Sequence, residues 1–148
     1  MTLSLAKNKI RKIENVSMLT NLTFLTLQSN RLSKIENLEG LINLKELYLS
    51  ENFIEKIENL EELKNLEILD IANNKISDLE GIDNKPYLVD LWLNNNLIKN
   101  FSDLENLLLV PTLKTIYLWK NPVSLFPSYK ETIIKYCPAI TQIDTTYL

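Results

Sequence analysis

The sequence predicts an α/β repeat solenoid with a parallel β-sheet on its concave face, and three observations support this. A pattern of the form L-x-x-L-x-L-x-x-N recurs every 22 residues and opens at Leu22, Leu44, Leu66 and Leu88. Asparagine holds the ninth place, in a column comprising Asn8, Asn30, Asn52, Asn74, Asn96 and Asn121. Hydrophobic residues make up 45% of the chain, enough for a continuous core. Together these features are typical of a leucine-rich-repeat solenoid.

Each repeat is expected to contribute one short strand, about six in all. In an L-x-L stretch such as Leu47-Tyr48-Leu49, alternation places both leucines on one face and the residue between them on the other. One repeat cannot bury its apolar face alone, so the strands should stack over a shared core. The recurrent asparagine should turn inward and bond the backbone, because an unpartnered buried amide costs about 1–3 kcal/mol.

The segments that lead from one strand to the next are near copies of one another at 35–38, 57–60 and 79–82. They are too short for long helices, so we expect a turn of 3₁₀ or short α-helix on the convex side of each repeat. Lys85 replaces a core leucine, and we expect its ammonium group to reach the surface.

Residues 122–148 are expected to form a C-terminal cap after the repeats at 1–121. Ser128 and Glu131 fit a capping box at the start of a helix, and Pro138 would end that helix. One face of the helix would cover the end of the sheet with Tyr129, Ile133, Tyr136 and Cys137.

The N-terminal end carries apolar residues where terminal repeats normally have a polar outer face. The residues expected to face solvent there are Leu3, Leu5, Ile10 and Ile13. We therefore expect the chain to be the last part of a longer array. The alternative is that the open end packs against another molecule. We expect the chain to be a monomer unless it associates through this end.

Cysteine usage indicates an intracellular protein of the nucleus or cytoplasm. Cys137 is the only cysteine, so no internal disulfide and no cysteine-rich cap can form, which favours a reducing compartment. No apolar run reaches the roughly 18 residues of a membrane span. Glycosylation sequons begin at Asn15, Asn21 and Asn100, which we interpret as chance in a chain rich in asparagine.

Composition also limits the classes of function. The net charge is −3, with 16 basic and 19 acidic residues interleaved, so we expect no direct nucleic-acid or membrane partner. Histidine is absent, which removes the commonest general base and the commonest transition-metal ligand. The sequence therefore predicts a protein that is not an enzyme and has no cofactor or metal.

Candidate binding residues lie in the variable positions between and beside the strand leucines, which should point out of the concave face. Exposed aromatic residues among a few charges are typical of protein-binding hot spots, whereas the alternative is a scatter of tolerated aromatics on a solvated sheet. The acidic residues should meet Lys or Arg on a partner. The predicted partner-binding residues are Phe24, Glu46, Tyr48, Asp70, Asp90, Trp92, Tyr117 and Trp119.

The repeats and the C-terminal segment together resemble one family. The resemblance depends on the Ile/Leu-Glu-Asn/Gly box of the return segments, on LWLNNN at 91–96, and on NPVSLFPSYKETIIKYCPAITQID at 121–144. They resemble the leucine-rich-repeat regulatory subunit of type-1 serine/threonine protein phosphatase, in its C-terminal half. The resemblance implies that the concave face binds the phosphatase catalytic subunit. It assigns this role to Asp70, Asp90, Trp92 and Tyr117, and more weakly to Glu46, Tyr48 and Phe24.

Two other readings of the sequence remain open. Trp119 departs from the phosphatase-regulator pattern, which tends to have a charged residue at that place. The spliceosomal A-prime leucine-rich protein ends in a similar capped array, so an adaptor in a ribonucleoprotein is the alternative function. An adaptor in an axonemal or cytoskeletal complex shares the repeat as well.

Overall fold

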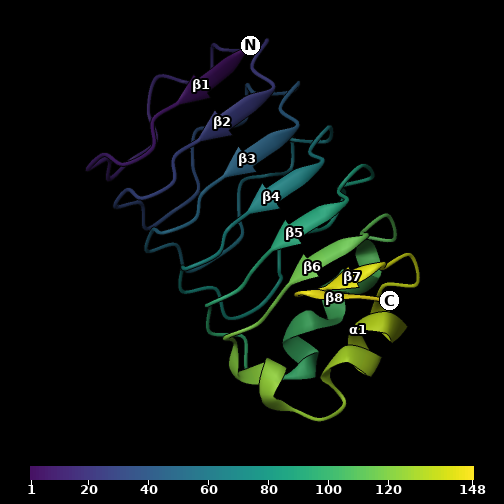
Figure 1. Ribbon diagram of the computed structural model, residues 1–148. Helices are drawn as coiled ribbons and strands as arrows, with labels where there is room; N and C mark the ends of the chain where they lie inside the picture. The colour runs from purple at the N-terminus through teal and green to yellow at the C-terminus, as the bar shows by residue number, and fades with distance from the viewer.

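The strands of successive repeats pair in parallel: the first five are 22 residues apart in the chain, and the fifth and sixth are 25 residues apart. The structure is a computed structural model that describes residues 1–148. For example, Tyr48 pairs with Asp70, and Asp70 pairs with Trp92. Figure 1 shows the strands stacked in chain order, which confirms the predicted parallel sheet. The repeat strands are β1 (Thr2–Ser4), β2 (Phe24–Thr26), β3 (Glu46–Tyr48), β4 (Ile68–Asp70), β5 (Asp90–Trp92) and β6 (Thr115–Tyr117).

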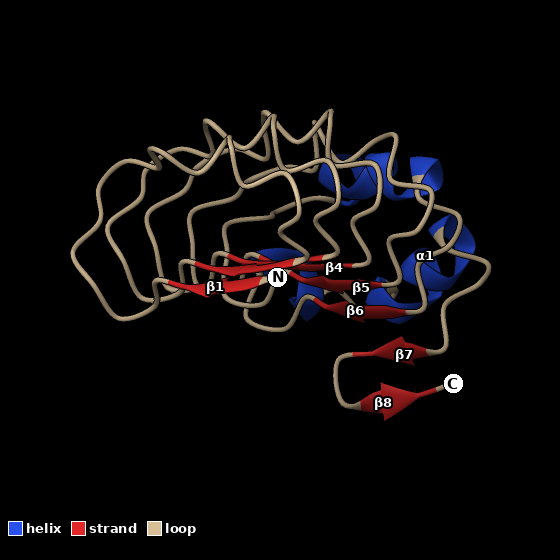
Figure 2. Ribbon diagram, turned by 90° about the horizontal axis from the view of Figure 1, so that it is seen from above, coloured by secondary structure: helices blue, strands red, loops and turns tan.

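The core runs the length of the stack as one apolar cluster of 38 residues. Figure 2 shows the strands along one side of the solenoid and the return segments along the other, with the core between these two sides. Burying one leucine or isoleucine side chain stabilises a fold by about 1.5–3 kcal/mol. The middle residue of each strand from β2 to β6 is fully buried: Leu25, Leu47, Leu69, Leu91 and Ile116.

The asparagine column forms the predicted hydrogen-bonded ladder. Asn52 is representative: its Nδ2 donates to the carbonyl of Leu49 at 3.0 Å and to that of Leu27, one repeat earlier, at 3.0 Å. Its Oδ1 accepts the amide of Leu32 at 2.9 Å. Each ladder residue therefore joins two repeats, because it satisfies backbone groups of both. The same arrangement recurs at Asn30, Asn74, Asn96 and Asn121.

The helical turns expected in the return segments occur in the first four repeats as single turns, in which an amide bonds the carbonyl three residues earlier, as from Leu41 to Leu38 at 2.9 Å. None of these turns continues into a longer helix. Asn37 and Asn59 explain this, because they adopt left-handed φ angles of 59° and 57°, which interrupt a right-handed helix. Their side chains instead donate to Ile13 and Ile35 of the preceding repeat at 2.6 and 2.7 Å. Only the longer fifth repeat contains a 3₁₀ helix, η1 (Phe101–Leu109).

The C-terminal cap continues the sheet instead of only covering it. After η2 (Pro122–Leu125) and α1 (Tyr129–Tyr136), β7 (Gln142–Ile143) pairs in parallel with β6. A final strand, β8 (Thr146–Tyr147), then pairs antiparallel with β7. Neither strand was predicted from the sequence. Ile133 and Cys137 of the capping segment are buried as expected.

The predicted capping box of α1 is wrong. The Ser128 side chain makes no capping hydrogen bond. Instead its carbonyl oxygen accepts both the amide and the hydroxyl of Thr132 at 2.9 Å. The first turn of the helix is therefore bonded to the backbone carbonyl of Ser128 and not to its side chain.

Asp144 ends the parallel part of the sheet. In the preceding rung, the amide of Leu93 donates to the carbonyl of Tyr117 on the next strand at 2.7 Å. In the last rung, Oδ1 of Asp144 accepts the equivalent amide of Leu118 at 2.7 Å and that of Trp119 at 2.9 Å. Its Oδ2 accepts the Tyr129 hydroxyl of α1 at 2.9 Å, so one carboxylate ties the sheet to the capping helix.

Lys85 was predicted to reach the surface, and this prediction is wrong, because the residue is only 2% exposed. Its Nζ donates to the carbonyl of Asp83 at 3.0 Å, and burial lowers the pKa of the ammonium group. The side chain stays within the stack because this backbone acceptor lies two residues away.

The N-terminal apolar residues are less exposed than expected. Ile13 is buried, while Leu3, Leu5 and Ile10 are partly buried and pack against the core. The second repeat covers them on one side, so only part of each side chain meets solvent.

Candidate functional site

The outward side chains of the sheet form a row of aromatic rings. Ring centroids lie 5.3 Å apart for Phe24 and Tyr48, 6.1 Å for Tyr48 and Trp92, and 5.9 Å for Trp92 and Tyr117. Tyr48 and Trp92 are on β3 and β5, two strand spacings or about 9.6 Å apart. Their rings therefore lean toward each other across β4, in the edge-to-face geometry that aromatic pairs favour.

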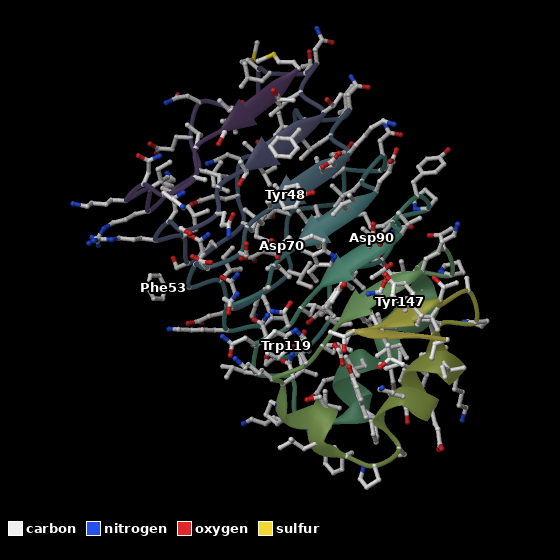
Figure 3. All side chains as sticks on the ribbon, in the orientation of Figure 1. Tyr48, Phe53, Asp70, Asp90, Trp119 and Tyr147 are labelled. Carbon is white, nitrogen blue, oxygen red and sulfur yellow. The ribbon has the colours of Figure 1, made fainter.

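Asp70 lies beneath this pair of rings. Figure 3 shows it next to Tyr48 on the sheet face, with Asp90 to the right of both, yet it is only 5% exposed. Its Oδ1 accepts the amide of Ala72 at 3.0 Å. The sequence predicted a direct partner contact at this position. A partner could reach the carboxylate only where the rings of Tyr48 and Trp92 separate.

The environment of Asp70 is polar but incompletely bonded. Burial raises the pKa of its carboxyl group, the nearby Ser50 hydroxyl and the Ala72 amide lower it, and Glu51 raises it further. Ser50 is 3% exposed, and its Oγ forms no well-aligned hydrogen bond, although the hydroxyl still favours the Asp70 carboxylate. Ser50 was not predicted as a site residue.

Acidic residues converge on Tyr48. Its hydroxyl donates to Oε2 of Glu46 at 3.0 Å. Burial, this hydrogen bond and the negative charges of Glu46, Asp70 and Asp90 raise the pKa of Tyr48 to about 12. The phenol therefore remains neutral at physiological pH. Glu46, Asp70 and Asp90 are the only charged residues at the positions between and directly beside the two leucines of each strand. This part of the face therefore carries only negative charge.

A hollow of about 280 Å³ lies at the C-terminal end of the aromatic row, lined by Trp92, Asn94, Tyr117 and Trp119. Trp119 is 43% exposed, and Nζ of Lys120 lies 4.6 Å from its ring centroid. This pairing gives Trp119 a different setting from the acidic part of the face.

The cap also supports this hollow. Nε2 of Gln142, on β7, donates to the Tyr117 hydroxyl at 2.8 Å and to the Asp144 carbonyl at 2.8 Å. Sequence reasoning missed Gln142 because no strand was expected beside β6. It also missed Asn94, although this residue directly follows the strand leucine Leu93 and was expected to point out of the concave face.

The chemistry of this face suits recognition of another protein. The structure holds no group of three or more His, Cys, Asp or Glu residues arranged to bind a metal. None of its helices has the length and apolar character needed to cross a membrane. What the face presents is a row of rings with three carboxylates, on strands held rigid by the ladder behind them.

Comparison with known protein families agrees with this architecture. The model described as "Leucine Rich repeats (2 copies)" matches residues 2–40, 42–84 and 64–106, well over half of the chain. The chain belongs to the leucine-rich-repeat family. It is a repeat scaffold whose regular 22-residue rungs end in a cap.

Among curated relatives, the chain is similar to protein phosphatase 1 regulatory subunit 7. The mouse (Mus musculus) protein is 48% identical over 48 residues, and the human (Homo sapiens) protein is 47% identical over a match of the same length. In each case the match covers 32% of this chain and 13% of the relative. The similarity thus spans far less than two thirds of those proteins.

Solved structures resemble nearly the whole chain. A leucine-rich-repeat protein of Leptospira interrogans has a TM-score of 0.82 and 31% identity, covering 97% of this chain and 36% of that one. A chain in the Drosophila melanogaster SNF/U2A′ complex has a TM-score of 0.64 and 32% identity, covering 99% and 74%. An internalin of Listeria monocytogenes, at 23% identity and a TM-score of 0.68, covers 99% and 48% and shows the shared fold alone.

Proposed function

We propose that this chain is a non-enzymatic scaffold that binds the catalytic subunit of type-1 protein phosphatase through its concave face. The observation that carries the proposal is the acidic and aromatic row formed by Phe24, Glu46, Tyr48, Asp70, Asp90, Trp92 and Tyr117. The local identity to a phosphatase regulatory subunit supports the choice of partner. The nucleus and the cytoplasm are the compartments in which we propose that it acts.

The chemistry of the face defines what such a partner must present. Glu46 and Asp90 are half-exposed and available to cationic side chains, while Trp92 and Tyr117 offer apolar area. Buried aromatic anchors beside charges of one sign give both affinity and orientation at protein interfaces. The partner surface should therefore be basic, with an apolar element that packs against Trp92.

Binding of the purified phosphatase catalytic subunit tests the proposal. The double variant Trp92→Ala with Asp90→Ala removes a central ring and an exposed carboxylate, so we expect at least about thirtyfold weaker binding by calorimetry, equal to a loss of about 2 kcal/mol. The matched control is Tyr147→Ala with Glu131→Ala, which removes the same two residue classes at exposed positions of the cap. Unchanged affinity in the Trp92 variant would exclude the proposed site.

An adaptor in a ribonucleoprotein is the second candidate function. The chain from the SNF/U2A′ complex resembles this protein over almost its entire length, which is the observation that favours it. Recombinant SNF and the phosphatase catalytic subunit can compete for the same immobilised chain. Capture of SNF in place of the phosphatase would favour the adaptor and contradict the phosphatase proposal.

A further inference from the structure

Cations that are far apart in the sequence line up along the edge of the solenoid where the strands end. Lys9, Arg31, Phe53 and Lys75 occupy one position in four successive repeats, and Lys12, Lys34 and Lys56 occupy another in three. Arg11 lies between the two columns. We call these residues the basic edge: Lys9, Arg11, Lys12, Arg31, Lys34, Phe53, Lys56 and Lys75. All of them are exposed.

The first column stands on a rigid backbone ladder. The amides of Arg31, Phe53 and Lys75 each donate to a carbonyl of the preceding repeat at 2.8 Å. Successive side chains are therefore held about 5 Å apart, the spacing of paired strands. Figure 3 shows Phe53 at this edge, away from Tyr48 and Asp70 on the sheet face.

Most of these cations have no acidic partner. Only Lys12, with Glu14 at 3.2 Å, and Lys75, with Glu55 at 3.9 Å, form ion pairs. Between positions 7 and 34 the chain has six basic residues and a single acidic one. The edge of the first two repeats is thus positively charged, although the whole chain carries a net charge of −3. Acidic residues border this edge at Glu36 and Glu58, and Glu51 and Glu55 flank Phe53, so the positive charge is concentrated at Lys9, Arg11, Lys12, Arg31 and Lys34.

One exposed ring interrupts the cation column. Phe53 is 51% exposed and is flanked by Arg31 in the repeat before and Lys75 in the repeat after. Nζ of Lys75 lies 5.7 Å from the centroid of its ring. The edge therefore offers a π-face for stacking within a line of positive charge.

We propose that the basic edge binds single-stranded nucleic acid, with phosphates on the Lys and Arg residues and one base stacked on Phe53. Proteins that bind single strands without strong sequence preference combine a basic track with aromatic stacking in this way. A narrow line of charge fits a linear polyanion better than a membrane, which needs a broad basic surface. An acidic peptide would use the charges but leave the ring of Phe53 without a planar partner.

This surface is separate from the concave face, so it adds a ligand to the proposed scaffold. The interleaving of basic and acidic residues along the chain predicted no nucleic-acid partner. The 22-residue period of the fold is what gathers the cations into columns.

Fluorescence anisotropy with a fluorescein-labelled deoxythymidine dodecamer, dT12, tests the proposal. At 50 mM salt we expect a Kd in the range of about 1–100 µM, weakening as salt rises with a log–log slope of roughly 0.7 per phosphate neutralised. Arg31→Glu with Lys34→Glu should weaken binding at least tenfold, and Lys9→Glu with Lys12→Glu should act likewise. The matched control, Lys114→Glu with Lys130→Glu, makes the same charge change elsewhere and should keep at least half of the affinity.

Phe53→Ala separates stacking from charge. It should weaken dT12 binding about fivefold, because stacking of one base contributes about 1–3 kcal/mol, and leave binding of linear polyphosphate unchanged. Absence of dT12 binding, or equal weakening by the control pair, would overturn the site. Tighter binding of poly-glutamate or phosphatidylserine vesicles than of dT12 would overturn the assignment to nucleic acid. Phosphatase capture should survive every basic-edge variant, so failure here is distinguishable from failure of the scaffold proposal.

Discussion

Two sets of buried polar groups lie on opposite sides of the same strands, and their hydrogen bonding differs. On the inner side, Asn74 has four partners: its Nδ2 donates to Leu49, Ile71 and Ala72, and its Oδ1 accepts from Ile54. On the outer side, Asp70 accepts one backbone amide, and the Ser50 hydroxyl has no partner. Both sets are shielded from water, but only the inner set is satisfied.

The difference separates structure from recognition. A buried polar group without a partner costs free energy, so a fold keeps one only where something else uses it. The asparagines hold neighbouring repeats together and recur unchanged. Asp70 and Ser50 occur in single rungs close to Tyr48, within the proposed phosphatase-binding face.

The largest expected effect is on the ladder. Asn74→Ala removes four hydrogen bonds and leaves buried backbone groups of two repeats unpaired, so we expect a loss of about 3–5 kcal/mol in the free energy of unfolding. Urea denaturation followed by circular dichroism measures it. Asn8→Ala is the control, because Asn8 is exposed and bonds only its own rung, and it should cost under about 1 kcal/mol. Equal losses in the two variants would contradict the distinction between inner and terminal positions.

A smaller effect of opposite sign is expected at Asp70. Because burial raises the folded-state pKa of this carboxyl group, the protonated form favours folding and that contribution is lost as pH rises through the raised pKa. Asp70→Asn removes the buried charge, so we expect about 1 kcal/mol of stabilisation at pH 7 and less at pH 3.5. Unfolding midpoints at the two pH values test this. A gain that is larger at pH 3.5 would reverse the sign and contradict the assignment.

The smallest expected effect is at Ser50. Ala72 occupies the equivalent place one repeat later, so Ser50→Ala fits without strain and removes an unpartnered hydroxyl. We expect stabilisation of about 0.5 kcal/mol at pH 3.5, where Asp70 is mostly neutral, and a smaller gain at pH 7, where the hydroxyl also favours the Asp70 carboxylate. The control is Ser124→Ala, which removes a hydroxyl that donates to the Asn121 carbonyl at 2.7 Å and should destabilise instead. Thermal unfolding of the two variants in parallel would show whether the signs differ.

Periodicity made most of the fold predictable. The strand leucines and the inward asparagines recur at one interval, so the sheet, core and ladder followed directly from the sequence. Where the period fails, the sequence was less informative. The strands β7 and β8 lie outside the repeat, and the burial of Lys85 depends on a backbone carbonyl of Asp83 that no pattern indicates.

The outward face was predictable in its membership but not in its geometry. Alternation placed Tyr48, Asp70 and Trp92 on one face, where the structure has them. It could not show that the two rings lean together and cover the carboxylate, because side-chain packing between non-adjacent strands depends on three-dimensional contacts. Gln142 escaped prediction for the same reason.

The Asp144 carboxylate gives the repeat array a defined stop. An open parallel edge is a template on which further strands can add, whether from the same chain or from another. Here the Asp144 carboxylate accepts the amides of Leu118 and Trp119, which the backbone carbonyls of a further parallel repeat would otherwise accept. Beside it the chain reverses direction, so that β8 runs antiparallel to β7. Further parallel rungs can therefore be added only before this end piece. For protein engineering, residues 122–148 are an end piece that could be joined to other 22-residue arrays to stop the parallel stack at a chosen repeat.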